Sequence, residues 1–120
     1  MILDTVTRAD EEEDEPEEEE EKKEPKAHEG FLGKLLKART VLVTGEVNQE
    51  MAEKVISQLL ILDAESQDPI RVLITSNGGH VDSGFAIHDI MRYVRSEVIA
   101  IGAGWVASIA VPILFGAPKK

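Results

Sequence analysis

The feature that most constrains the fold of this chain is an alternation, between residues 40 and 115, of β-branched apolar runs with helically spaced apolar stripes. Residues 40–44 (TVLVT) and 71–75 (RVLIT) are typical of short buried strands. Between them, residues 48–64 place apolar side chains at helical spacing, and Asn48 is a suitable N-cap. This order favours right-handed β-α-β crossovers. We therefore predict an α/β fold with a mostly parallel sheet.

The same order repeats in the second half of the chain. The glycine-rich segment 76–84 (SNGGHVDSG) precedes a helical stripe for which Asp82 or Ser83 is the expected N-cap. A second run, 98–101 (VIAI), reads as a strand that Gly102 and Gly104 interrupt, with a helix expected from Val106 onward. Ligand sites of parallel sheets lie beyond the carboxyl ends of the strands, so the two glycine turns are expected to meet there.

The charge of the chain is concentrated at its N-terminus. The sequence holds 23 acidic and 13 basic residues, a net charge of −10; residues 1–30 hold 14 and 4 of these, which leaves nine of each in residues 31–120. We predict an acidic disordered tail over residues 1–30 and a folded domain over residues 31–120. The tail either keeps the protein in solution or docks on a basic partner. An electroneutral body gives no reason to expect nucleic-acid binding.

Cysteine content and hydropathy narrow the class of protein. The chain has no cysteine, which excludes disulfides and thiolate metal sites and fits a reducing compartment. It shows neither a signal peptide nor a run long enough to span a bilayer, so we expect a soluble protein that is not exported. Residues 31–39 (FLGKLLKAR) favour a short amphipathic helix that packs on the body or on a neighbouring subunit; nine residues bury too little to anchor in lipid.

The two glycine turns suggest a chemistry. Gly78 and Gly79 leave backbone N–H groups open to a ligand, and Ser108 follows the second turn near a helix start. Together with the N–H of Ile109, they would place a hydroxyl nucleophile between two donors, as acyl transfer requires. Two other interpretations remain open at this point: a glycine-rich turn also binds phosphate, and a small serine near a helix start often serves packing alone.

The order of several motifs resembles one family. The matching segments are LLKART followed by VLVTGEV, the helix NQEMAEKVISQLLILDAE, then RVLITSNGG, GFAIHDIMRYVRSEV and GWVASIAVPILFGAPKK. From about Leu35 to Ala117 the chain resembles ClpP, the proteolytic subunit of the ATP-dependent Clp protease. The resemblance implies a ClpP/crotonase-like fold of repeated β-α-β units, truncated here to its N-terminal part.

The resemblance also implies roles for individual residues and partners. Ser108 matches the nucleophile, Gly79 and Ile109 match the oxyanion-hole residues, and His80 and Val81 match a strand segment that lines the substrate cleft. The family implies a cytoplasmic serine endopeptidase that assembles into rings with ClpP-like subunits and receives unfolded polypeptide from a Clp ATPase. No cofactor, metal, nucleic acid or membrane is expected. Two ligands such as His80 and Asp82 do not make a metal site.

Several departures from the family pattern affect this interpretation. Asn77 and Thr75 stand where the family has proline and asparagine, and the bulky Trp105 lies near the nucleophile. The general-base histidine and the orienting aspartate of the family follow the serine in segments that this chain does not contain. Of the three histidines, His28 falls in the tail, His88 is expected on a solvated helix surface, and His80 matches no base position.

We therefore expect no peptidase activity from the 120-residue chain alone, because a serine without a base is a poor nucleophile. Two alternatives from other classes remain. One is a non-catalytic structural subunit of a mixed Clp ring. The other is an acyl-CoA-binding protein of the related crotonase architecture, which also uses backbone oxyanion holes.

Overall fold

The computed structural model describes residues 30–120, and the chain separates into two units, residues 1–34 and 35–120. The disorder predicted for the acidic tail and His28 lie outside the described residues. Residues 30–37 are helical, as the amphipathic pattern predicts. Leu36 packs against the hydrophobic core, whereas Phe31 is 67% exposed.

Three strands form one parallel sheet in the order β1-β2-β3. They are β1 (Thr40–Val47), β2 (Ile70–Gly79) and β3 (Val98–Val106). The α/β class and the parallel sheet are thus confirmed. Each strand extends three to five residues beyond its predicted C-terminal end. The glycines that were expected to end the strands lie inside them, near positions where the register of one strand with its neighbour shifts.

Three further helices connect and follow the strands: α2 (Gln49–Glu65), α3 (Val81–Tyr93) and α4 (Ala110–Phe115). The prediction for Asn48 is confirmed, since its Oδ1 accepts a hydrogen bond from the N–H of Met51 at 2.8 Å. The predicted N-cap of α3 is wrong. His80 is the cap, because β2 continues to Gly79 and the helix begins two residues later, so that Asp82 and Ser83 fall within its first turn.

The start of the last helix also differs from the expectation. The strand continues to Val106, where the sequence pattern predicted the helix to begin, and α4 starts at Ala110. Pairing with β2 holds the chain extended past the glycines: Val106 pairs with Ser76, and the N–H of Ala107 donates to the carbonyl of Ser76 at 3.0 Å. Ser108 therefore lies in the turn before the helix.

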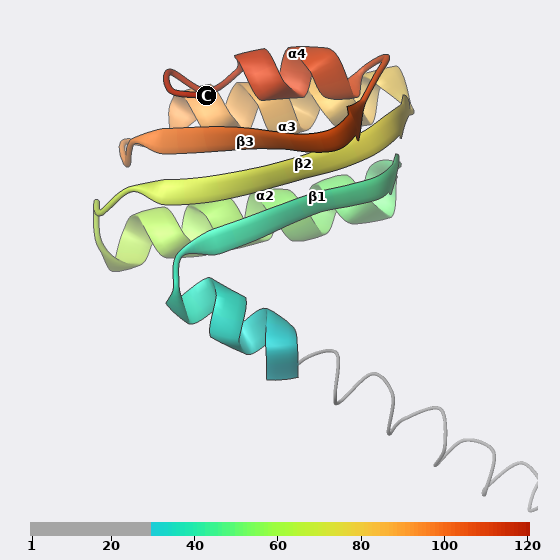
Figure 1. The fold of residues 1–120 in the computed structure, drawn as a ribbon. Helices are drawn as coiled ribbons and strands as arrows, with labels where there is room; N and C mark the ends of the chain where they lie inside the picture. Colours follow the sequence, from blue (N-terminus) through green and yellow to red (C-terminus); the bar gives the residue numbers. More distant parts are fainter. Residues whose placement is uncertain (1–29) are drawn as a thin grey trace, which may run out of the picture. The chain divides into compact units, whose positions relative to one another are not determined.

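The core lies between one face of the sheet and the helices, which cover that face (Figure 1). Alternate residues of β2 are buried, and those between them are more exposed. The largest fully buried side chains, which come from strands and helices alike, are Leu59, Ile70, Ile74, Ile87, Met91 and Ile113. None of α2, α3 and α4 lies on the opposite face of the sheet (Figure 1). None of the helices in residues 30–120 is long and apolar enough to cross a membrane.

Candidate active site

The turn that joins β3 to α4 holds Ser108 in an unusual backbone conformation. Its φ is +57°, in the left-handed region that residues with a Cβ rarely adopt. The turn is tied at both ends: the N–H of Ala107 bonds to β2, and the carbonyl of Ser108 accepts from the N–H of Val111 at 3.0 Å. The serine itself is exposed. A strained serine on a strand-to-helix turn is the backbone arrangement of the nucleophile elbow in many hydrolases.

Gly78 is the residue of β2 that lies directly against this serine. A Cβ built on Gly78 would lie 2.6 Å from Cβ of Ser108 and 3.1 Å from its Oγ, and the φ of Gly78 is +105°. Any other residue would push the serine away. Gly78 therefore meets the serine turn at the carboxyl edge of the sheet. Gly102 and Gly104, the predicted second turn, lie inside β3 beside Ile74 and Thr75 and do not make this contact.

Gly79, the predicted oxyanion-hole residue, faces the neighbouring strand at close range. A Cβ on Gly79 would collide with the backbone of Val47 in β1, so this position also admits only glycine. The next N–H, that of His80, donates to the carbonyl of Val47 at 2.8 Å. Gly78 and Gly79 thus serve two different close approaches, one to the serine turn and one to β1.

Ile109, the second predicted donor, is the N-cap residue of α4. Its side chain is buried against Gly84 of α3, which anchors the serine turn to the helix layer. Among residues 30–120 its backbone N–H has no hydrogen-bond acceptor. The N–H next to the serine is therefore free to bind an oxygen of a ligand.

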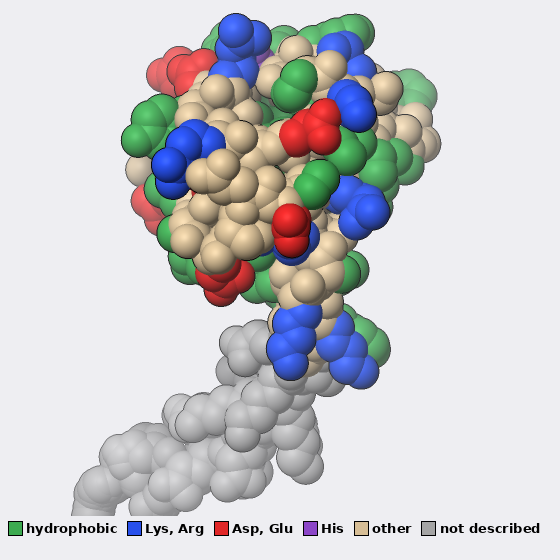
Figure 2. Space-filling view, turned by 90° about the vertical axis from the view of Figure 1, so that its left-hand side faces the viewer, with side chains coloured by type: hydrophobic (Ala, Val, Ile, Leu, Met, Phe, Trp, Pro, Cys, Tyr) green, Lys and Arg blue, Asp and Glu red, His purple; other side chains and the backbone are tan. Residues whose placement is uncertain are grey.

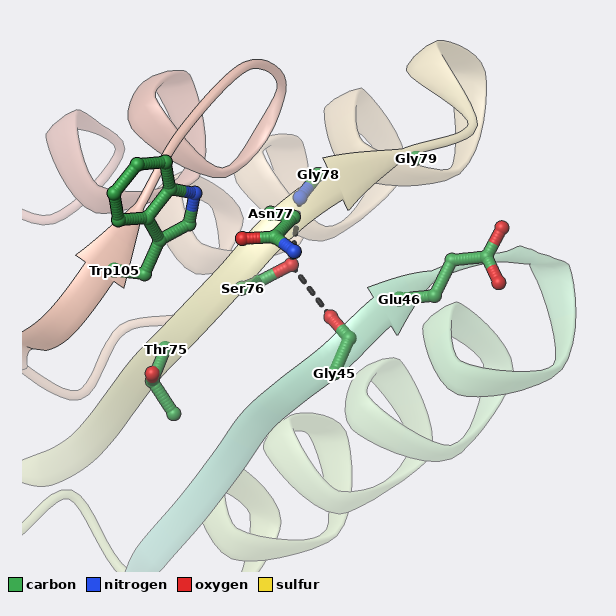
Figure 3. Close-up of a pocket in the computed structure, with 8 residues that line it drawn as sticks. All are labelled: Gly45, Glu46, Thr75, Ser76, Asn77, Gly78, Gly79 and Trp105. Atoms are coloured by element: carbon green, nitrogen blue, oxygen red, sulfur yellow. Dashed lines mark hydrogen bonds between the residues drawn. The ribbon is translucent and has the colours of Figure 1, made fainter.

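Ser76 is a component of the site that the sequence interpretation missed. It is 4% exposed, and its Oγ accepts from the N–H of Gly78 at 2.9 Å while donating to the carbonyl of Gly45 in β1 (Figure 3). This bridge lies where the β1–β2 register shifts, so the hydroxyl bonds to backbone groups at that irregularity. The sequence offers one sign of this role, a serine directly before Asn-Gly-Gly. Only the register shift between β1 and β2 shows that its hydroxyl bridges the two strands.

The described histidines do not contact Ser108. Nδ1 of His80 lies 2.7 Å from Oγ of Ser83 and caps α3; His80 and the 53% exposed Val81 thus form the start of a helix and not the expected strand segment. His88 is not simply solvated as expected: it lies 2.9 Å from Oδ1 of Asp89, and its ring packs near Gly116 after α4. Neither ring is placed to take a proton from the serine.

A pocket of about 530 Å³ opens beside the glycines of β2 (Figure 3). Trp105 of β3 and Glu46 of β1 lie on either side of Asn77. The full lining is Gly45, Glu46, Thr75, Ser76, Asn77, Gly78, Gly79 and Trp105. Ser108 is not part of the lining, but Gly78 borders both the pocket and the serine. The sequence interpretation noted the bulk of Trp105 and missed Glu46.

Known proteins match this chain closely. The Clp protease family model matches residues 22–120. The ATP-dependent Clp protease proteolytic subunit 3 of Rhizobium meliloti is 46% identical over 102 residues, which are 81% of this chain and 52% of that protein. Proteolytic subunit 2 of Pseudomonas aeruginosa is 47% identical over 85 residues, 71% of this chain and 42% of that protein.

Solved structures agree with the sequence relatives. ClpP1 from Listeria monocytogenes superposes with a TM-score of 0.69 at 47% identity, covering 72% of this chain and 51% of that one. The ClpP protease catalytic domain from Plasmodium falciparum gives 0.68 at 40% identity, with 71% and 49% covered. The chain spans about half the length of the relatives it matches. With its parallel sheet and its serine turn, it belongs to the Clp protease family.

Proposed function

We propose that this chain forms the N-terminal half of a ClpP-type serine endopeptidase subunit, with Ser108 as the nucleophile. The observation that carries the proposal is the left-handed turn of Ser108, exposed between β3 and α4 and seated on Gly78. A hydroxyl held in this way is presented to a peptide carbonyl without rotation of the surrounding backbone.

The backbone N–H groups of Ile109 and Gly79 bind the oxyanion in this proposal. Attack of Oγ on the carbonyl carbon places negative charge on the carbonyl oxygen, and fixed N–H donors stabilise that charge most when they need no reorganisation. The absence of an acceptor for Ile109 within the described residues supports its role. His80 and Val81, at the start of α3, line the path of the substrate.

The proton of Ser108 has no acceptor among the described histidines, since His80 bonds to Ser83 and His88 to Asp89. In this proposal the base comes from the part of the family domain that this chain does not span. Unfolded polypeptide is the substrate, delivered by a Clp ATPase to a ring of ClpP-like subunits; the names of the relatives, ATP-dependent proteolytic subunits, support this part.

The test adds to this chain the C-terminal half of a relative. We would join residues 35–120 to the C-terminal half of Listeria monocytogenes ClpP1, a 47% identical relative, and treat the folded product with a fluorophosphonate probe. Labelling of the joined chain, lost in Ser108→Ala and kept in the exposed-serine control Ser57→Ala, is expected. The 120-residue chain alone should show no turnover of a fluorogenic peptide.

Two results would argue against the proposal. Labelling that persists in Ser108→Ala would show that another residue is the nucleophile. A folded, ring-forming product that the probe does not label would favour the second candidate, a non-catalytic subunit of a mixed ring.

A further inference from the structure

The pocket beside Gly78 is lined by two side chains, Glu46 and Trp105, that have no role in the proposed serine chemistry. Its lining contains one carboxylate, Glu46, and one aromatic side chain, Trp105, with small polar residues and glycines between them. At about 530 Å³ it lies within the size range of ligand-binding sites and exceeds the volume of a single side chain.

Trp105 is held out of the core by an irregularity of β3. Ile74 pairs with Gly102 and Ser76 pairs with Val106, so three residues of β3 oppose Thr75 alone. Gly104 within this bulge has φ +67°, and a Cβ on it would lie 3.6 Å from Oγ1 of Thr75. The extra residues lift the indole above the sheet, where it is 65% exposed.

Glu46 is placed by the matching irregularity of β1. Gly45, at φ +85°, occurs where the register of β1 with β2 shifts, and Glu46 then pairs with Gly78. The carboxylate is exposed and forms no ion pair with any residue between 30 and 120. Two bulges, one on each neighbour of β2, thus place an indole and a carboxylate on opposite sides of the pocket, and in Figure 3 the Glu46 side chain extends outward from β1.

We propose that this pocket binds a lysine or arginine side chain of a polypeptide. Long basic side chains combine an apolar stem, which packs on an indole, with a cationic head that a carboxylate and the face of an indole attract. Asn77 and Thr75 of β2, which also line the pocket, offer hydrogen-bonding groups between Trp105 and Glu46 (Figure 3). Because Gly78 borders both the pocket and Ser108, the pocket would select substrates with a basic residue near the cleaved bond. This selection rests on the proposed function, whereas binding of a basic side chain in the pocket does not.

The chain provides its own probe for this binding, because Trp105 is its single tryptophan. We would titrate the 120-residue chain at 150 mM salt with a blocked Gly-Arg-Gly peptide and follow the tryptophan emission. The comparison ligand is the same peptide with citrulline, which keeps the shape of arginine and removes its charge. We expect the arginine peptide to bind about fivefold more tightly than the citrulline peptide.

Matched variants locate the effect. Glu46→Gln should weaken the arginine peptide about fivefold and leave the citrulline peptide unchanged. Glu65→Gln changes the net charge equally at the far end of α2 and should alter neither. Trp105→Phe, followed by amide shifts at Asn77 and Gly78, should weaken arginine binding because phenylalanine attracts cations less than tryptophan.

Equal affinity for the two peptides would overturn the inference. So would equal losses in Glu46→Gln and Glu65→Gln, which would show attraction to the net negative chain and not to this pocket. Ser108→Ala should bind the arginine peptide as the original chain does, so failure of the serine chemistry and failure of this inference give different results. Both Glu46 and Trp105 are exposed, and thermal unfolding checks that the variants fold.

Discussion

Single glycines decide the geometry of the serine turn. Gly78 and Gly45 both have positive φ, but their surroundings differ. A Cβ on Gly78 would collide with Ser108, whereas a Cβ on Gly45 would meet nothing within 4 Å. Substituting each glycine in turn therefore distinguishes the free energy lost to left-handed backbone strain from the free energy lost to a steric clash.

We predict that Gly78→Ala lowers the free energy of unfolding by about 3 kcal/mol, because it adds overpacking against Ser108 to backbone strain. Gly45→Ala should cost about 1 kcal/mol, from strain alone. Urea denaturation of the 120-residue chain measures both. Equal losses in the two variants would mean that the contact between Gly78 and Ser108 carries no energy.

Elements are tied together at the opposite end of the sheet, where α2 ends and β1 and β3 begin. The guanidinium of Arg39 donates to the carbonyls of Leu62 and Ser66, each at 3.0 Å, at the end of α2. Asp63 of α2 accepts from both the N–H and the Oγ of Ser96, each at 2.8 Å. These hydrogen bonds from Ser96 lower the pKa of the Asp63 carboxyl below its usual value of 3.8, and the nearby Arg95 lowers it further.

This pKa shift predicts a pH dependence of stability. Because the pKa of Asp63 is lower in the folded state, its ionised form stabilises the fold in full above the unfolded pKa near 3.8, and the contribution is lost as the pH falls through the folded pKa. The difference in unfolding free energy between the original chain and Asp63→Asn should therefore shrink from pH 5 toward pH 2.

Urea melts at several pH values measure this difference. Asp68→Asn is the control, since the carboxylate of Asp68 bonds to no other residue within the described part of the chain. A difference for Asp63→Asn that stays constant with pH would contradict the assignment.

At the scale of the whole molecule, the net negative charge belongs to the N-terminal segment, and the rest of the chain is electroneutral. The end of the sheet where the strands begin shows lysine, arginine and acidic side chains interspersed (Figure 2). This agrees with the equal numbers of acidic and basic residues in residues 31–120, while the net charge of −10 comes from residues 1–30.

We predict that a chain of residues 31–120 passes an anion exchanger at pH 7, where the full chain is retained until high salt. Without its net charge the shorter chain should also self-associate more, because exposed apolar side chains such as Ile101 and Trp105 are no longer opposed by charge repulsion. Light scattering at matched concentration measures this. Equal scattering from the two chains would mean that the acidic segment does not keep the molecules apart.

The sequence by itself determined the alternation of strands and helices, the parallel sheet, the cap at Asn48 and the serine beside a glycine turn. These follow from patterns within a few residues, since apolar spacing and side-chain caps act locally. Tertiary structure decided where the strands end: glycines that locally favour a break remain in β1, β2 and β3, because hydrogen bonds from the neighbouring strand hold them extended.

Tertiary structure alone also decided the details of the site. That Gly78 lies against Ser108, that Ser76 bridges two strands, and that Trp105 and Glu46 line one pocket on either side of Asn77 (Figure 3) all depend on the registers of β1 and β3 with β2. Register is a relation between segments some 30 residues apart, and two bulges shift it here. A local pattern names the residues of such a site, and the pairing of distant strands sets the contacts among them.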